Sequence, residues 1–304
     1  MKKPILLITF NRPETTRLVL EEIRKYRPEE LYIAADGPRA GVEHDAERCR
    51  AVRELAGNVD WKCRVHTLFQ EQNLGCQAAP VKAISWFFET EEEGIILEDD
   101  CVPTQDFFRF AEQMLTIYRE DSRIMHIAGM NFQDGIRRGC GDYFFTHQPF
   151  CWGWATWRRA WKEFQLDMPD FPEYRKENKI AEIFPRDRYP RWRYMRLFQK
   201  CYEKSPYFKD VWDFQWTYAI FRKKGLCIVP NYSLVSNIGM EGTHFIPAEL
   251  CGTEVRPMPE KIVPPPEIAV DPEADGYFFR KVNKGDWKDL VRYILSLITL
   301  RDWM

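Results

Sequence analysis

The chain lacks several features that would assign it quickly. No GxGxxG run follows its first strand-like segment and no Walker lysine motif occurs, which weighs against dinucleotide-dependent dehydrogenases and P-loop enzymes. Its longest apolar stretches fall short of the roughly 20 residues that a membrane span needs. The formal net charge is only -2, so the overall charge does not favour a nucleic-acid partner. An anionic ligand would have to be held by a local group of residues.

The nine cysteines are scattered without CxxC or Cys/His zinc spacing, and their number is odd. Reduced thiols in the cytoplasm are the simplest account. The start, Met1-Lys2-Lys3-Pro4, leads directly into an apolar strand-like run, so we expect no secretion signal. These observations predict a cytoplasmic protein, with peripheral contact at the inner face of the membrane left open.

Strand and helix patterns alternate through the first hundred residues. We predict strands at 4–9, 31–35, 62–69 and 94–98, and helices at 13–26, 44–56 and 77–89. A further helix and strand follow Asp106, and a basic, aromatic helical region covers about 173–204. Alternation at this spacing predicts an α/β fold with a mostly parallel central sheet flanked by helices.

Changes in composition and pattern along the chain indicate how it is organised. We expect one domain over 1–245, in two halves at 1–135 and 136–245. Residues 246–304 are expected to form an extended arm, rich in Pro and acids, and a C-terminal amphipathic helix.

The most informative segment is Gly94-Ile95-Ile96-Leu97-Glu98-Asp99-Asp100-Cys101, an apolar strand that ends in three consecutive acids. Burying such a cluster without neutralising it is very costly. The pattern is therefore typical of a site where a divalent cation or a sugar hydroxyl takes up the charge, and the other interpretation is a solvated acidic turn. In open α/β sheets, ligands bind beyond the carboxyl ends of the strands, which is where these acids fall.

Two other strand ends carry candidate residues. Arg12 lies where the first strand becomes a helix and can reach an anionic ligand beside the backbone amides of the helix, or it is simply exposed. Asp36 ends the second strand and can accept a hydrogen bond from a base or a ribose hydroxyl, or it forms an Asx-turn.

Two later residues are also candidates. Asp213 lies in Trp212-Asp213-Phe214-Gln215-Trp216, where the tryptophans can partly desolvate the carboxylate and favour its use as a general base. Its alternative roles are a helix cap or an ion-pair partner. His244 follows in a loop, where it either ligates a metal or contacts a diphosphate, or is exposed.

The segments ITFNRP, ADGPR and ILEDDCVPTQDFF, in this order and spacing, resemble a GT-A nucleotide-sugar glycosyltransferase. More narrowly, the chain resembles the inverting N-acetylglucosaminyltransferase that starts complex N-glycan branching, over roughly residues 4 to 245. The resemblance implies a GT-A, Rossmann-like fold, with a nucleotide-sugar-binding half at 1–135 and an acceptor half at 136–245. It also implies roles for particular residues. Arg12 would contact the donor diphosphate or the nucleobase pocket, Asp36 the uracil, Glu98 and Asp99 the ribose and sugar, Asp100 a Mn²⁺ or Mg²⁺ ion, and Asp213 would be the general base.

The implied activity is metal-dependent, inverting transfer of a hexosyl or N-acetylhexosaminyl group from a UDP-sugar to a glycan or glycolipid hydroxyl, as in polysaccharide biosynthesis. Two alternatives stay open: a sugar nucleotidyltransferase and a noncatalytic nucleotide- or glycan-binding module. A nucleotidyltransferase normally has a Gly-rich, basic loop after the first strand, and this chain has none there.

Two aromatic or apolar features have two interpretations each. Trp152, Trp154 and Trp212 either form a stacking platform for a saccharide acceptor or belong to the core. The tail, residues 286–304, is amphipathic, with Lys288, Arg292 and Arg301 beside a broad apolar face. Such a terminal helix usually packs on its own domain, and docking on a membrane or a partner subunit is the alternative.

Overall fold

The computed structural model describes residues 2–239 and 255–299 of the chain. Its centre is an eight-stranded sheet with strand order β3-β2-β1-β4-β8-β6-β9-β7. The strands are β1 (Ile5–Thr9), β2 (Glu30–Ala35), β3 (Arg64–Phe69), β4 (Glu93–Glu98), β6 (Ile124–Ala128), β7 (Tyr143–Thr146), β8 (Trp154–Trp157) and β9 (Leu226–Pro230). Six strands run in one direction, while β7 and β8 run against them. The predicted α/β fold with a mostly parallel, Rossmann-like sheet is confirmed.

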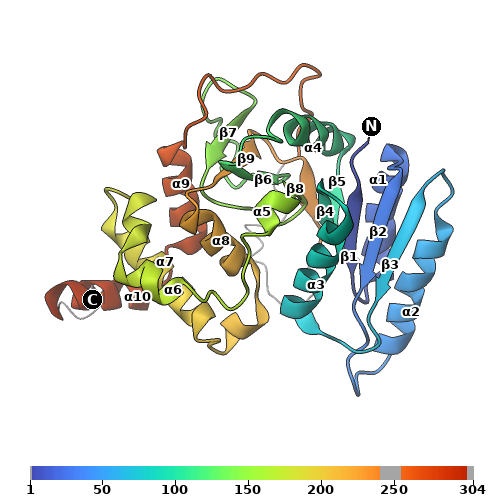
Figure 1. Ribbon diagram of the computed structural model, residues 1–304, viewed down its shortest axis with the longest axis horizontal. Coiled ribbons are helices and arrows are strands. Elements are labelled where there is room, and N and C mark those ends of the chain that lie inside the picture. Colours follow the sequence, from blue (N-terminus) through green and yellow to red (C-terminus); the bar gives the residue numbers. More distant parts are fainter. Residues whose placement is uncertain (1, 240–254, 300–304) are drawn as a thin grey trace.

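Helices cover both faces of this sheet (Figure 1). One face carries α1 (Pro13–Tyr26) and α4 (Gln105–Ile117), with α2 (Asp45–Leu55) beside α1. The other face carries α3 (Gly75–Thr90), α5 (Arg158–Trp161), α6 (Phe171–Lys176), α7 (Arg188–Tyr202) and α8 (Asp213–Arg222). Short 3-10 turns link several of these: η1 (Ala56–Asn58), η2 (Lys179–Glu182) and η3 (Tyr207–Asp210).

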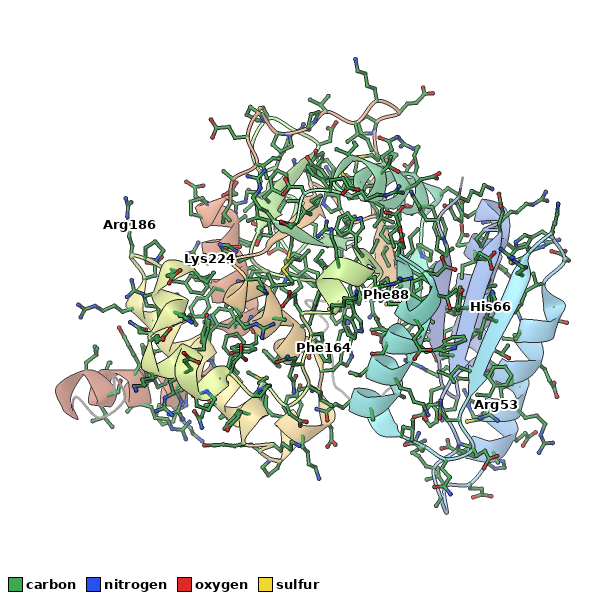
Figure 2. The ribbon with its side chains drawn as sticks, in the orientation of Figure 1. Arg53, His66, Phe88, Phe164, Arg186 and Lys224 are labelled. Atoms are coloured by element: carbon green, nitrogen blue, oxygen red, sulfur yellow. The ribbon has the colours of Figure 1, made fainter. Side chains whose placement is uncertain are left out.

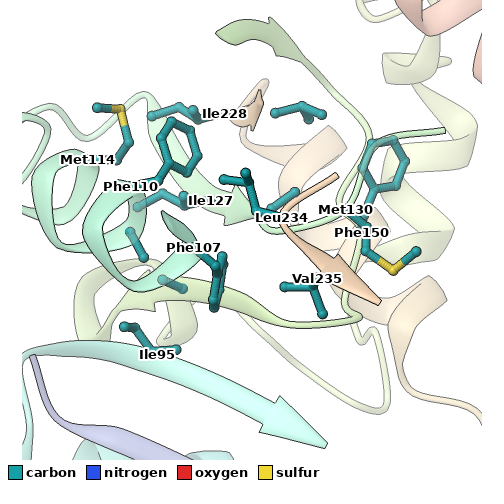
Figure 3. Close-up of a cluster of buried hydrophobic side chains, with 14 of the residues drawn as sticks. Ile95, Phe107, Phe110, Met114, Ile127, Met130, Phe150, Ile228, Leu234 and Val235 are labelled. Atoms are coloured by element: carbon teal, nitrogen blue, oxygen red, sulfur yellow. The ribbon is translucent and has the colours of Figure 1, made fainter. Parts of the chain in front are cut away.

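Successive side chains of β1 point to opposite faces of the sheet, so this one strand contributes to two hydrophobic clusters. Ile5 and Leu7 are fully buried in the cluster under α1 and α4, whereas Leu6 lies in the cluster under α3. Figure 3 shows part of the first cluster, where Phe107 and Phe110 of α4 lie over the sheet among aliphatic side chains. In Figure 2, Phe88 of α3 is directed into the molecule, while Arg186 extends outward. Because β1, β2 and β4 are buried on both faces, their sequences are nearly continuous apolar runs.

A small antiparallel ribbon completes the carboxyl edge of the sheet. The three acids at 98–100, which we call the acidic turn, lead directly into β5 (Cys101–Pro103). This strand pairs with β10 (Val235–Asn237), with Asn237 opposite Cys101. The ribbon therefore carries the segment after β9 back to the acidic end of β4.

The C-terminal region wraps around the sheet before it ends in helices. Residues 255–271 have almost no regular secondary structure. They contact the body through the bridges Val255 to Ser233 and Val270 to Phe145, and Arg109 of α4 donates to the carbonyls of residues 258–260. They lead into α9 (Pro272–Phe278), the turn η4 (Phe279–Asn283) and α10 (Trp287–Thr299). No helix in the described residues is long and apolar enough to cross a membrane. The predicted boundaries at 135 and 245 stay predictions.

Most predicted elements of the first hundred residues occur within two residues of their expected ends, and α1 spans 13–26 as predicted. The expected helical region at 173–204 is instead α6, η2 and α7, separated by turns. The strands β5, β7, β8, β9 and β10 were not predicted. β7 and β8 are four residues long, buried throughout and aromatic, so their sequences show no alternation.

Candidate active site

The carboxyl ends of three parallel strands meet at one place on the sheet edge. Thr9 at the end of β1 is in register with Ala35 of β2, and Ile8 is in register with Glu98 of β4. The segments that follow these strands therefore begin side by side. The structure thus brings Arg12, Asp36 and the three acids to the same edge.

Arg12 holds the acidic turn together. Its guanidinium lies 2.6 Å from Asp99 Oδ1 and donates a 2.7 Å hydrogen bond to Asp100 Oδ2. The backbone N–H of Phe10 donates to the other Asp99 oxygen at 3.0 Å. Arg12 occupies the cap position of α1 with non-helical dihedral angles and makes no side-chain cap bond. One cation therefore faces three acids, and the turn keeps an excess of negative charge.

Burial and this excess of charge shift the pKa values of two of the carboxyls. Burial, together with the charges of Asp100 and Asp99, raises the pKa of Glu98 to about 8. Burial also raises the pKa of Asp99 to about 6, although the Arg12 charge opposes the shift. Such carboxyls gain from any ligand that brings positive charge or hydrogen-bond donors.

Asp213 lies in the same electrostatic neighbourhood, since its charge adds to the raised pKa of Glu98. It is the first residue of α8, where the positive end of the helix dipole favours a carboxylate. The prediction that Trp212 and Trp216 partly desolvate the Asp213 carboxylate is wrong, because Asp213 is exposed. Trp212 and Trp216 are one helical turn apart and point into the core, whereas Asp213 faces solvent.

The segment before α8 is fastened to the start of α3. The Cys76 thiol donates to the carbonyl of Asp210 at 2.9 Å, and the Gln77 amide donates to the carbonyl of Val211. This attachment places η3 and the start of α8 beside the sheet edge. Partial burial raises the pKa of the Tyr207 phenol in η3, and the charge of Asp213 adds to this shift. Sequence reasoning missed Tyr207 and Cys76, because no motif surrounds either of them.

Asp36 is occupied by the protein itself. Its carboxylate accepts from the backbone N–H groups of Gly37, Leu74 and Gly75 at 2.8–3.0 Å and from the Asn73 amide at 2.9 Å. These bonds fill the roughly four acceptor positions of a carboxylate. Asp36 thus anchors the loop before α3 to the end of β2, and its contact with a base stays a prediction.

A second ion-paired acid, Asp45, orders the loop after Asp36. Arg39 donates to both Asp45 oxygens at 2.7 and 2.9 Å, and the Asn11 amide donates at 2.5 Å. The Arg39 hydrogen bond is the main reason why the pKa of Asp45 falls to about 2. This cluster, which sequence reasoning did not identify, links the loop at 37–45 to the segment that carries Arg12.

The Asp100 carboxylate has one oxygen less strongly engaged than the other. Arg12 donates to Oδ2, while among the described residues Oδ1 accepts only a weak 3.4 Å bond from the buried Cys101 thiol. Gly239 lies against this carboxylate, where an added Cβ would come within 2.2 Å of Oδ2. Asn237 accepts from the Gly239 N–H at 2.8 Å and fixes that approach.

Of the two predicted metal ligands, Asp100 and His244, the structure describes only Asp100. No group of three or more His, Cys, Asp and Glu residues suited to a metal ion occurs in the described part of the chain. Mg²⁺ is commonly held by one or two carboxylates plus substrate phosphates, and Asp100 with its available Oδ1 fits that mode. His244, the other predicted ligand, lies outside the described residues.

The aromatic platform is mostly core. Trp154 is fully buried and Trp212 nearly so, and their rings stack with centroids 6.0 Å apart. Trp152 is half-buried against Phe132. Of the two interpretations, the core role is the one observed for Trp154 and Trp212.

Two hollows in the described part of the chain bear on the site. A cavity of about 10 Å³, room for one water at most, lies beneath Asp36 between β1, β2, β3 and α3. A cavity of about 110 Å³ is lined by Arg137, Asp142, Asn231, Tyr232, Leu234 and 256–259, and it shares no residue with the acidic turn.

No protein-family model matches the chain, and no curated protein matches it. Among solved structures, it is similar to UDP-glucose pyrophosphorylase complexed with UDP-glucose, with a TM-score of 0.41 and 11% identity over 79% of this chain and 94% of that one. It is also similar to 4-diphosphocytidyl-2C-methyl-D-erythritolsynthase from Anaerococcus prevotii DSM 20548, with a TM-score of 0.36 and 9% identity over 76% and 91%. HddC from Yersinia pseudotuberculosis matches with a TM-score of 0.27 and 10% identity over 37% of this chain, which spans only 54% of HddC. Similarity at this level assigns neither a family nor an activity.

Proposed function

We propose that this chain is a metal-dependent, inverting glycosyltransferase that takes its sugar from a UDP-sugar. The observation that carries the proposal is the convergence of Glu98, Asp99 and Asp100 with Arg12 at the sheet edge, within range of the Asp213 charge. The GT-A resemblance quoted above supports the same reading, because its motifs supply these very residues.

The donor half of the site would work through charge. Asp100 would hold Mn²⁺ or Mg²⁺ through Oδ1, together with the donor diphosphate. When bound, the cation supplies Lewis-acid stabilisation of the leaving nucleoside diphosphate. Arg12 keeps Asp99 and Asp100 in fixed positions, and Glu98 is the carboxyl left to accept hydrogen bonds from sugar or ribose hydroxyls.

The acceptor half would work through Asp213. Its solvent-facing carboxylate takes the proton of an acceptor hydroxyl while that oxygen attacks the anomeric carbon. The bond from this carbon to the diphosphate oxygen breaks, and the electron pair leaves with the nucleotide. A single displacement of this kind inverts the anomeric centre.

The first experiment is a thermal-shift screen of nucleotides and nucleotide sugars with Mn²⁺ and with EDTA. A ligand that binds only the folded state raises the midpoint, so a UDP-sugar should raise it more with Mn²⁺. In Asp100→Ala, the shift with Mn²⁺ should equal the shift with EDTA. An Mn²⁺-dependent shift of wild-type size in that variant would overturn the metal assignment.

The second experiment separates chemistry from binding. Asp213→Asn should lower the transfer rate by about 10²–10⁴-fold and leave donor affinity unchanged, because an amide cannot take the proton. Asp210→Asn, an exposed acid three residues earlier in the same segment, is the matched control and should transfer at the wild-type rate. Equal transfer rates in the two variants would show that another residue is the general base.

Product analysis decides between this proposal and its alternatives. A glycosyltransferase releases UDP from a UDP-sugar when an acceptor is present. Release of pyrophosphate from UTP and a sugar 1-phosphate would identify a nucleotidyltransferase, and saturable donor binding with neither product would identify a noncatalytic module.

A further inference from the structure

The C-terminal helix α10 packs on the protein through its polar side. Asp289 is buried and lies 3.3 Å from Arg193 of α7 and 3.3 Å from Arg292. Ser296 is buried on the same side. Between them, the Tyr293 ring lies 5.5 Å from that of Trp192. The helix starts firmly, since Asp286 accepts from the Asp289 N–H at 2.9 Å.

The opposite side of α10 is apolar and exposed. The exposed fractions are 70% for Trp287, 47% for Leu290, 44% for Val291, 48% for Ile294, 53% for Leu295 and 39% for Leu297. At about 100° per residue these six side chains form one continuous face, which we call the apolar face of α10. Figure 1 shows α10 at the left edge of the molecule, extending away from the body. The helix therefore does pack on its own domain, as expected, but its apolar face is turned outward, whereas such helices usually turn it inward.

Cationic residues lie at the border of this face and in α7, on the other side of α10. Helix α7, on which α10 packs, carries four arginines and one lysine and no acid. Burial lowers the pKa of Lys200, and the charges of Arg193, Arg196 and Arg292 add to that shift. Lys288 lies at the border of the apolar face, and the only acid within α10, Asp289, is turned inward to two arginines.

We propose that α10 lies in the headgroup region of an anionic bilayer, with its apolar face inserted among the acyl chains. The combination of a broad apolar face, a tryptophan at its start and flanking cations suits such a surface. With 13 residues, α10 is about 20 Å long and too short to span. A second copy of the chain fits less well, because a symmetric pair would bring two clusters of like charge together. This inference does not depend on the proposed function.

Vesicle sedimentation with the full-length chain tests the proposal. The protein should pellet with vesicles that are one-third phosphatidylglycerol and two-thirds phosphatidylcholine, and remain in the supernatant with phosphatidylcholine alone. Added salt should release it, because exposed charges are screened. A protein that stays in the supernatant with both kinds of vesicle overturns the proposal.

A matched pair of variants locates the contact. Ile294→Glu should weaken the vesicle affinity at least about tenfold, because burial of one such side chain contributes about that much. Ile117→Glu, at a 62% exposed isoleucine of α4, should bind like wild type. Both positions are exposed, so both variants should keep the wild-type unfolding midpoint. Equal vesicle binding by the two variants overturns the proposal. It is also overturned if the wild-type protein does not bind vesicles but forms a concentration-dependent dimer that Ile294→Glu dissociates.

Discussion

Replacing Arg12 with methionine tests whether the acidic turn depends on this one cation. Methionine keeps much of the length of arginine but leaves Glu98, Asp99 and Asp100 with no positive charge at the contacts of 2.6 and 2.7 Å. Removing one partner of a buried ion pair costs about 3–5 kcal/mol. The Arg12 side chain is 28% exposed, so we expect the lower end, a loss of about 3 kcal/mol in the free energy of unfolding at pH 8.

The loss should depend on pH with a definite sign. Burial already raises the pKa of Glu98 and Asp99 in the folded state, and removing the guanidinium raises both further. The folded variant then binds protons more readily than the unfolded chain, so its stability falls as the pH rises through the folded pKa values. The difference from wild type should therefore be largest at pH 8 and shrink towards pH 5.

Urea unfolding in EDTA at the two pH values measures this difference by linear extrapolation. Arg24→Met is the matched control, because Arg24 also forms a bidentate pair with an acid, Asp60, but on the exposed surface. That control should change little. Combining Arg12→Met with Asp99→Asn should recover part of the loss, since it removes one of the stranded charges. Equal, small losses for Arg12→Met and Arg24→Met would refute the reasoning.

Three further outcomes are expected. Burial lowers the pKa of His126 to about 3, so the folded protein keeps this ring neutral while the unfolded chain takes up a proton below about pH 6.5. The stability that wild type loses between pH 7 and pH 5 should therefore be about 2 kcal/mol smaller in His126→Gln, as measured by chemical denaturation. Gly239→Ala should weaken Mn²⁺-dependent donor binding in the thermal-shift assay, because its Cβ would meet Asp100 at 2.2 Å, whereas Gly57→Ala, in open space, should not. Asp36→Asn should lower the free energy of unfolding by about 2 kcal/mol at pH 7, because the new amide faces donors, and an unfolding midpoint equal to wild type would contradict this.

The first half of the sheet could be predicted because its local and global signals agree. Buried parallel strands are apolar throughout, and the helix from Pro13 begins with a proline and keeps its apolar spacing to Tyr26. The residues that end β1, β2 and β4 follow from topology alone, since parallel strands bring their carboxyl ends together. For this reason Arg12, Asp36 and the three acids could be placed at one edge of the sheet from the sequence.

The rest of the site depends on tertiary contacts that leave no local pattern. Nothing near Arg12 shows that its guanidinium turns to Asp99 and Asp100 rather than to a ligand. The Asp36 carboxylate looks available to a ligand in the sequence. In the structure it is occupied by N–H groups of the loop at 73–75, which is distant along the chain. The orientation of α10 was equally hidden, because an amphipathic pattern identifies two faces but does not say which one meets the protein.

The place of β8 in the sheet has a consequence for how the protein is made. β8 pairs with β4 on one side and β6 on the other, yet its four residues follow β4 by more than fifty positions. A ribosome adding about 5–20 residues per second needs several seconds to cover that distance. During this interval one edge of β4, with Ile95 and Ile96, has no strand beside it and can pair with another nascent chain. The interval is a point at which slow translation or premature termination favours aggregation, and where a chaperone that shields strand edges has most to protect.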